Sequence, residues 1–165
     1  MNHRVAVVMG SASDKEIAWD AIKTLREYGV SCTARVLSAH RTPGEAQAFA
    51  ASVQQEGCSV VIAFAGMAAH LAGALAANTT LPVIGVPVAS GGLGGMDAVL
   101  STLQMPPGIP VATVAVNGAR NAALLALEML AISDAELQKK LIAGRAAMRE
   151  KVLAADEALQ TDWKE

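Results

Sequence analysis

Residues 60–77 read Val-Val-Ile-Ala-Phe-Ala-Gly-Met-Ala-Ala-His-Leu-Ala-Gly-Ala-Leu-Ala-Ala, an almost wholly apolar run. The run is about as long as a transmembrane helix, so a membrane span is the first alternative. Two glycines and a histidine interrupt it, however, and Pro82, Pro87 and a cluster of glycines follow soon after. These interruptions favour a buried strand, a loop and a short helix over a span. The run therefore predicts one β-α unit of a globular domain and no membrane partner.

The same β-α pattern recurs on both sides of this run. Helical spacing lies between the strand-like runs; Ile17, Ala21 and Leu25 share one helix face, and Gly29 is placed to cap that helix. Continuous apolar strands that alternate with helices are typical of a parallel sheet covered on both faces. The predicted strands are Val5–Val8, Cys32–Leu37, Val60–Phe64, Val83–Val88 and Val111–Val116.

This pattern predicts an α/β fold that is doubly wound. We expect a flavodoxin-like three-layer sandwich with a five-stranded parallel sheet of order 2-1-3-4-5 and a C-terminal helix. One domain should span residues 1–165, with a core at about 4–131 and a charged, alanine-rich helical extension at about 133–160. Three helix starts have capping-box spacing: Ser13 with Glu16, Thr42 with Glu45 and Pro43 between them, and Ser133 with Glu136.

Charge is distributed unevenly along the chain. There are 13 Lys and Arg against 15 Asp and Glu, with no block of like charges, which disfavours a nucleic-acid or anionic-membrane partner. Cys32 and Cys58 lack CxxC spacing, and the apolar run near the amino terminus is too short for a signal peptide, so we expect a cytoplasmic protein with reduced thiols. Between residues 57 and 119 the only charged residue is Asp97, which predicts burial between subunits.

The loops at the carboxyl ends of the strands are the expected place for a ligand. After the first strand, residues 10–14 read Gly-Ser-Ala-Ser-Asp and open a helix, whose free N–H groups and dipole favour an anion. Asp14 can accept hydrogen bonds from sugar hydroxyls. The alternative is that Ser13 is only an N-cap and Asp14 a first-turn acid. Neither GxGxxG nor GxxxxGK[ST] spacing is present, so a dinucleotide or nucleoside triphosphate is not indicated.

The next two loops each hold a histidine. In Ser38-Ala39-His40-Arg41-Thr42-Pro43, His40 can transfer protons at neutral pH and Arg41 can grip a phosphate. The alternative is a surface loop with an ordinary exposed histidine. In residues 65–73 the small residues let backbone approach a ligand closely, and His70 is the only titratable group. The alternative for His70 is a satisfied core histidine.

The fourth loop, residues 90–97, is dense in glycine and ends in Asp97. It suits a mobile lid or a close subunit contact, while the alternatives are a flexible loop and an acid that only caps a helix. The histidines and cysteines lack the spacing of a metal site, so we expect no metal. A nucleophile elbow with Ser-His-Asp order is also absent from the sequence.

Taken together, these motifs resemble the N5-carboxyaminoimidazole ribonucleotide mutase family of purine biosynthesis. The resemblance covers about residues 4–131. The family pattern more often has Gly and Pro where this chain has Met67 and Ala72. A related branch that uses free carbon dioxide usually lacks the histidine of the third loop, so His70 favours the mutase. The matching motifs are MGSASD at 9–14, SAHRTP at 38–43, AGMAAHL at 65–71, LPVIGVP at 81–87, QMP at 104–106 and NAALL at 121–125.

The resemblance implies an isomerase that moves a carboxylate from the exocyclic nitrogen of a small-molecule ribonucleotide to ring carbon 4. It implies that ATP, metal and biotin are not needed as cofactors, that His40 is the general acid and base, and that the chain forms a homo-octamer. Implied phosphate contacts are Ser11, Ser13, Ser38 and Arg41; Asp14 would hold the ribose; Ala39, Ala65, Gly66, Ala69, His70 and Leu71 would line the rest of the substrate site.

Two other functions remain to be weighed. The nearer one is an aminoimidazole ribonucleotide carboxylase that uses free carbon dioxide. The other is a non-catalytic nucleotide-binding or receiver-like module, because a fold alone does not dictate a function. A receiver is expected to carry an acidic cluster at its strand ends, whereas this chain offers Ser, His, Arg and Gly there.

Overall fold

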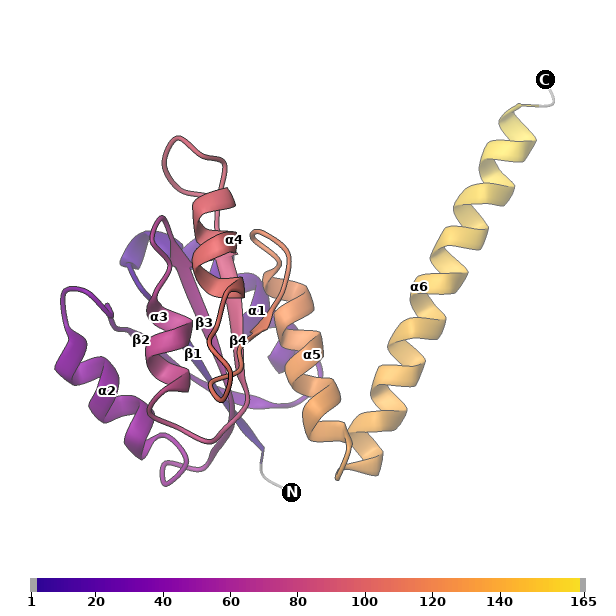
Figure 1. Ribbon diagram of the computed structural model, residues 1–165. Coiled ribbons are helices and arrows are strands. Elements are labelled where there is room, and N and C mark those ends of the chain that lie inside the picture. Colours follow the sequence, from indigo (N-terminus) through magenta and orange to yellow (C-terminus); the bar gives the residue numbers. More distant parts are fainter. Residues whose placement is uncertain (1–2, 164–165) are drawn as a thin grey trace.

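A five-stranded parallel sheet forms the centre of the computed structural model, which describes residues 3–163 (Figure 1). Its order is β2-β1-β3-β4-β5, so the predicted fold class and strand order are confirmed. The inner strands β1, β3 and β4 are almost fully buried, as their continuous β-branched runs predict. The strands are β1 (Arg4–Met9), β2 (Ser31–Val36), β3 (Cys58–Gly66), β4 (Val83–Val88) and β5 (Ala112–Thr113).

Helices cover both faces of the sheet (Figure 1). On one face, α1 (Lys15–Glu27) and α5 (Ala119–Ala131) pack on alternate residues of β1, β3 and β4. On the other face, α2 (Pro43–Ser52) and α3 (Leu71–Ala76) pack on the intervening residues. Helix α4 (Met96–Leu103) also lies on this second face. It lies so close to β4 that a Cβ on Gly85 would be 2.3 Å from a Thr102 methyl.

The apolar run at 60–77 forms most of β3, a turn and α3, as predicted. Within the described residues 3–163, no helix combines the length and apolar character that crossing a membrane requires.

The two outer strands of the sheet, β2 and β5, differ from the prediction. Most of β2 is exposed, so this strand is not covered on both faces. The fifth strand was expected at Val111–Val116 but has only two regular residues. The reason lies in β4: the peptide groups of Gly85 and Pro87 face β5, where their carbonyls accept from Val114 (3.1 Å) and Asn117 (2.8 Å). Pro87 has no N–H to donate back, so regular pairing ends after Thr113.

Helix ends also correct three predictions. The capping box is Ser11 with Asp14, around the short 3₁₀ helix η1 (Ala12–Asp14), and not Ser13 with Glu16. Helix α6 (Ala135–Asp162) is capped by Asp134 and not Ser133, because the Asp134 carboxylate accepts from two N–H groups of the first turn. Thr42 precedes α2, but its hydroxyl bonds to the Ser38 backbone instead of capping the helix.

The predicted cap at Gly29 is confirmed. Gly29 has a φ of 80° and its N–H donates to Arg26, while Val30 N–H donates to Leu25. This pair of bonds is a Schellman motif, in which a left-handed glycine ends the helix.

Helix α6 leaves the body of the protein and projects away from it (Figure 1). Leu137 and Leu141, in its first two turns, are its buried residues. The Lys140 ammonium donates to the Tyr28 carbonyl at 3.0 Å, and Gly144 lies against the Tyr28 hydroxyl. Beyond this attachment, residues 145–163 are exposed.

Candidate active site

A cavity of about 500 Å³ lies at the carboxyl ends of the strands, where the loops after β1, β2, β3 and β4 meet. The loops that the sequence singled out are therefore brought together, as expected for a doubly wound sheet. The cavity is lined by Gly10, Ser11, Ser13, Asp14, Ser38, Ala39, His40, Arg41, Ala65, Gly66, Met67, Ala68, His70, Leu71 and Ser90.

The first wall of the cavity is built around Asp14. This residue is 5% exposed, and its carboxylate accepts from the Ser11 N–H at 3.1 Å and from the Ser13 hydroxyl at 3.4 Å. Burial raises the pKa of Asp14, while these hydrogen bonds and the positive charge of Arg41 act against the rise. The Ser13 hydroxyl also donates to Ser11 Oγ at 2.9 Å. A carboxylate has about four lone-pair sites, so Asp14 keeps acceptor capacity for a ligand.

Arg41 connects the second loop to the first. Its guanidinium donates to the Gly10 carbonyl at 3.1 Å and, through Nε, to Ser38 Oγ at 3.4 Å. The Ser38 hydroxyl also accepts from the Arg41 N–H at 3.1 Å. These contacts hold a positive charge beside a group of hydroxyls, which suits a phosphate.

The two histidines of the site face each other across the second and third loops. The rings of His40 and His70 are stacked, with centroids 5.8 Å apart and planes 18° apart. Both residues are exposed at the cavity, so His70 is not a core histidine and that alternative is wrong. A pair of imidazoles in a cavity that also holds Arg41 and several hydroxyl groups can supply and remove protons on a bound ring.

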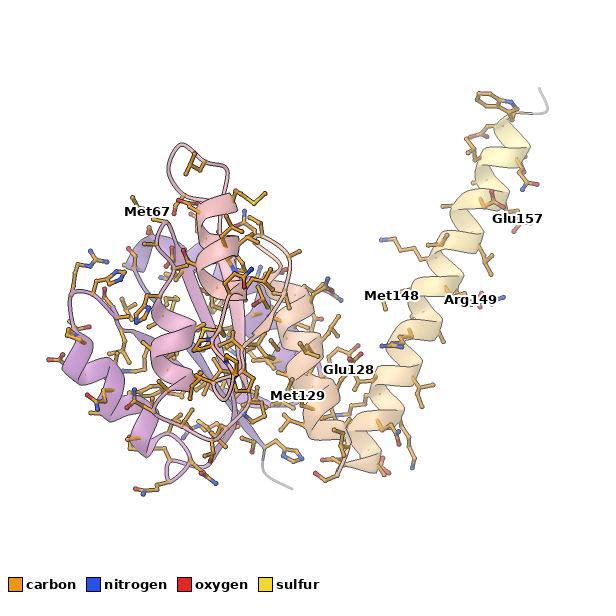
Figure 2. The ribbon with its side chains drawn as sticks, viewed as in Figure 1. Met67, Glu128, Met129, Met148, Arg149 and Glu157 are labelled. Carbon is orange, nitrogen blue, oxygen red and sulfur yellow. The ribbon has the colours of Figure 1, made fainter. Side chains whose placement is uncertain are left out.

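The third loop shows why its residues are small. A Cβ on Gly66 would lie 1.9 Å from Ser90 Oγ, so only glycine lets the fourth loop approach β3 this closely. Met67 has a φ of 56°, the left-handed region that glycine adopts freely. A glycine here, as expected from the family that the sequence resembles, would adopt this backbone conformation without strain. Met67 is 61% exposed at the rim of the cavity (Figure 2).

Eleven of the twelve predicted site residues line this cavity, and Ala69 does not. Ala69 is 2% exposed; its side chain belongs to the interior under the loop. The structure adds Gly10, Met67, Ala68 and Ser90 to the lining. Ser90 follows β4 directly, so the rule that ligands bind at strand ends was the signal that could have found it.

A larger cavity of about 940 Å³ lies at the other end of the strands, beside the amino ends of β4 and β5. It is lined by loop residues such as Asn78, Thr79 and Ile109, and its lining contains no His, Asp, Glu, Lys or Arg. Groups that transfer protons or grip anions are found in the smaller cavity, which makes that one the candidate active site. Among residues 3–163, no three His, Cys, Asp or Glu side chains are grouped so that they could hold a metal ion.

Comparison with known proteins identifies the family of the chain. The AIR carboxylase family matches residues 4–151. The N5-carboxyaminoimidazole ribonucleotide mutase of Methanocaldococcus jannaschii is 49% identical over 160 residues, covering 97% of this chain and 99% of that protein. The mutase of Brucella melitensis is 51% identical over 154 residues, covering 92% and 95%. The crystal structure of Treponema denticola PurE superposes with a TM-score of 0.87 at 27% identity, covering 95% of this chain and 98% of that one. The chain therefore belongs to the AIR carboxylase family.

Proposed function

We propose that this protein is an N5-carboxyaminoimidazole ribonucleotide mutase, an isomerase of purine biosynthesis. The observation that carries the proposal is the convergence of His40, His70, Arg41 and Asp14 on one cavity, in a chain about half identical to proteins of that name. The reaction moves the carboxylate from the exocyclic nitrogen of the ribonucleotide to carbon 4 of its imidazole ring.

The chemistry follows from the substrate. An N-carboxylate is a carbamate, which loses carbon dioxide when its nitrogen takes up a proton. The enamine-like ring carbon then attacks the carbon dioxide, and the proton on carbon 4 leaves to restore the aromatic ring. One proton is taken up and one is released, so the reaction is balanced without a further reactant. The site must hold carbon dioxide and ring together until they recombine.

His40 is the general acid and base of this proposal. It protonates the exocyclic nitrogen, becomes neutral, and later removes the proton from carbon 4, which returns it to its starting state. His70, stacked on His40, lines the pocket for the carboxylate with the backbone of Ala65 and Gly66. Ala39 and Leu71 line the cavity around the imidazole ring of the substrate, while the buried Ala69 supports the third loop from below.

The ribonucleotide is held by the polar side of the cavity. Ser11, Ser13, Ser38 and Arg41 bind the phosphate and neighbouring groups, which the hydrogen bonds of Arg41 to the first two loops support. Asp14 binds the ribose hydroxyls. Its carboxylate is already fixed by Ser11 and Ser13, so it need not be reorganised when the ligand arrives.

The competing activity is direct carboxylation of aminoimidazole ribonucleotide by free carbon dioxide, which the name of the matched family favours. The two are separated by offering the purified protein either the N5-carboxy substrate or aminoimidazole ribonucleotide with bicarbonate. We expect the 4-carboxylate from the first substrate at a rate that added bicarbonate does not raise. Turnover with aminoimidazole ribonucleotide and bicarbonate, but not with the N5-carboxy substrate, identifies the carboxylase. Binding without turnover in both mixtures identifies a non-catalytic module.

We also propose a homo-octamer, which is the assembly that the family resemblance implies. The uncharged segment between residues 57 and 119 exposes large apolar side chains for other copies to cover. Met67, Leu93, Met96, Leu100 and Leu103 are each more than half exposed in the single chain. Met67 lines the cavity, so a neighbouring chain that covers Met67 would also shield this side of the cavity from water. Leu100→Glu should lower the mass measured by light scattering and the turnover together. A single-chain mass for the unmodified protein, with full activity, contradicts this assembly.

The cytoplasm is the compartment that this proposal implies. Cys32 and Cys58 are free thiols on β2 and β3, with β1 between them. Two strand spacings separate them, which exceeds the reach of a disulfide. Reduced thiols on the purified protein, measured by reaction with a thiol reagent after unfolding, are the expected result.

A further inference from the structure

The projecting part of α6 carries a regular apolar stripe. Met148, Val152, Ala155 and Leu159 follow one another at spacings of four, three and four residues. This is the heptad pattern of a helix that packs along a second helix. Met148, Val152 and Leu159 are 50%, 68% and 58% exposed, so nothing in the single chain covers the stripe along residues 148–159.

The charges on α6 indicate what covers the stripe. In the projecting part of the helix, residues 145–151 contain three Lys or Arg and one Glu, whereas residues 152–162 contain three Asp or Glu and no Lys or Arg. A second copy of α6 that runs in the opposite direction sets each basic half beside an acidic half. A parallel copy sets like halves together. We propose that α6 pairs antiparallel with α6 of a second copy of this chain, in a twofold-symmetric contact.

The heptad pattern defines the register of this pair. In an antiparallel pair, Met148 faces Leu159 of the other copy and Val152 faces Ala155, and symmetry repeats both contacts. The same register places Arg149 beside Asp156 of the other copy, twice. Within one helix these two residues are seven positions, or about 10.5 Å, apart, so they cannot pair with each other. Arg149 now contacts its neighbour Glu150 at 3.2 Å, in a fully hydrated position that it can leave.

The attached end of α6 fits the tip of the second helix. A crevice of about 270 Å³ opens between α5 and α6, lined by Ile132, Leu141, Ile142 and Arg145 among others. Leu141 and Arg145 continue the heptad stripe, so stripe and crevice form one surface. In the proposed register, Trp163 of the second copy lies beside this crevice. Trp163 is 85% exposed in the single chain, and the crevice offers its indole the apolar side chains of Ile132 and Ile142 beside the ion pair of Arg145 and Glu128.

Figure 2 shows the two sides of the helix that the test uses. Met148 lies on the side turned toward the body, where Glu128 of α5 is also found, and Glu157 lies on the side turned away. A substitution on the Met148 side changes the apolar stripe, whereas a substitution on the Glu157 side leaves it intact. All of them fall on exposed turns beyond the attachment, and circular dichroism checks that the fold is kept.

Cysteine pairing tests the direction of the second helix. Full-length chains with Met148→Cys and Leu159→Cys, carrying different tags, are co-expressed and oxidised. We expect a disulfide between the two tagged chains, none between copies of Met148→Cys expressed alone, and none in the unmodified protein, whose two cysteines lie in the sheet. Failure of the mixed pair to form overturns the proposal. Efficient pairing of Met148→Cys with itself shows a parallel contact and overturns it equally.

A charge exchange tests the register. Arg149→Asp and Asp156→Arg each set like charges together twice, so each should raise the concentration at which the pair dissociates about tenfold. The double variant exchanges the partners and should return to within about threefold of the unmodified protein. Glu157→Arg makes the matched charge change on the outer side and should have no effect. A double variant no better than the singles overturns the register.

The pairing stands apart from the reaction proposed above. Turnover is measured on the same preparations, with the N5-carboxy substrate. If the mixed disulfide does not form in a protein that still turns over, the pairing alone is overturned. If the chains pair but show no turnover, the proposed reaction alone is overturned.

Discussion

Replacement of His40 by Asn is the most direct test of the proposed chemistry. The variant keeps a polar side chain of similar reach at the cavity, but an amide cannot gain and lose a proton near neutral pH. Arg41, Asp14 and the serines that hold the ribonucleotide are untouched, and their hydrogen bonds do not involve the His40 ring. Binding and assembly should therefore be kept while turnover is lost.

The size of the loss follows from the number of proton transfers. A positioned acid or base contributes typically about 10²–10⁴-fold, and here both the uptake and the release of a proton depend on His40. We expect kcat to fall by at least about 10³-fold, which corresponds to about 4 kcal/mol of transition-state stabilisation. KM should change little, so kcat and kcat/KM should fall by the same factor. The ring of His70 is stacked 5.8 Å from that of His40 and cannot occupy its position.

The assay follows formation of the 4-carboxylate from the N5-carboxy substrate, with substrate affinity measured separately by calorimetry. His3→Asn is the matched control, because His3 lies beside Asp134, at the base of α6. That variant should turn over normally. Turnover by His40→Asn within about tenfold of the unmodified enzyme would falsify the assignment. A large rise in Kd with unchanged kcat would instead make His40 a binding residue.

Three further predictions concern the rest of the cavity. Arg41→Ala should weaken ribonucleotide binding. Removing the phosphate from the ligand should then lower the affinity of the unmodified protein far more than that of the variant; equal losses of affinity in calorimetry rule out Arg41 as the phosphate contact. Asp14→Asn should weaken substrate binding yet stabilise the free protein at neutral pH. Because burial raises the pKa of Asp14, its protonated form is favoured by folding, so the advantage of the variant should disappear as the pH falls below 3.8, in urea unfolding at several pH values. An advantage that stays constant with pH contradicts this account. Gly66→Ala should cost about 1–3 kcal/mol in the same unfolding assay, because its Cβ would meet Ser90 Oγ at 1.9 Å, and Ser90→Gly should recover part of the loss. An unchanged midpoint for Gly66→Ala shows that the fourth loop moves freely.

The inner fold could be predicted from local patterns. The three buried strands are continuous apolar runs, and Gly29 follows a helix with regular apolar spacing, so each signal lies within its own segment. The end of β5 could not be predicted this way. It depends on Pro87 of a neighbouring strand, which lies more than twenty residues earlier in the chain.

The predicted capping residues at the helix starts were wrong for a different reason. Ser11, Ser13 and Ser133 each have an acid three residues later, and Asp134, directly after Ser133, is itself a favourable N-cap residue, so the sequence offers competing caps. The choice depends on backbone geometry: Ser11 has the extended conformation of an N-cap, with a φ of −148°.

The candidate site was predicted in its loops but not in every residue. The loops after β1, β2 and β3 contain few chemically active side chains, so the choice among them was narrow. Ser90 was missed because a glycine-rich loop has no preferred path in the sequence alone. The strand-end rule points to this loop, but the distance of Ser90 from the cavity depends on its close approach to Gly66 at the end of β3, a contact between two separate segments.

The shortness of β5 bears on aggregation. A long free strand at the edge of a sheet offers N–H and C=O groups on which a strand from another molecule can grow. At this edge β5 offers two regular residues, and the chain beyond them turns away at Asn117, which has a φ of 56°. Amyloid-like growth, which adds strands one by one, therefore finds a regular template of only two residues at the β5 edge.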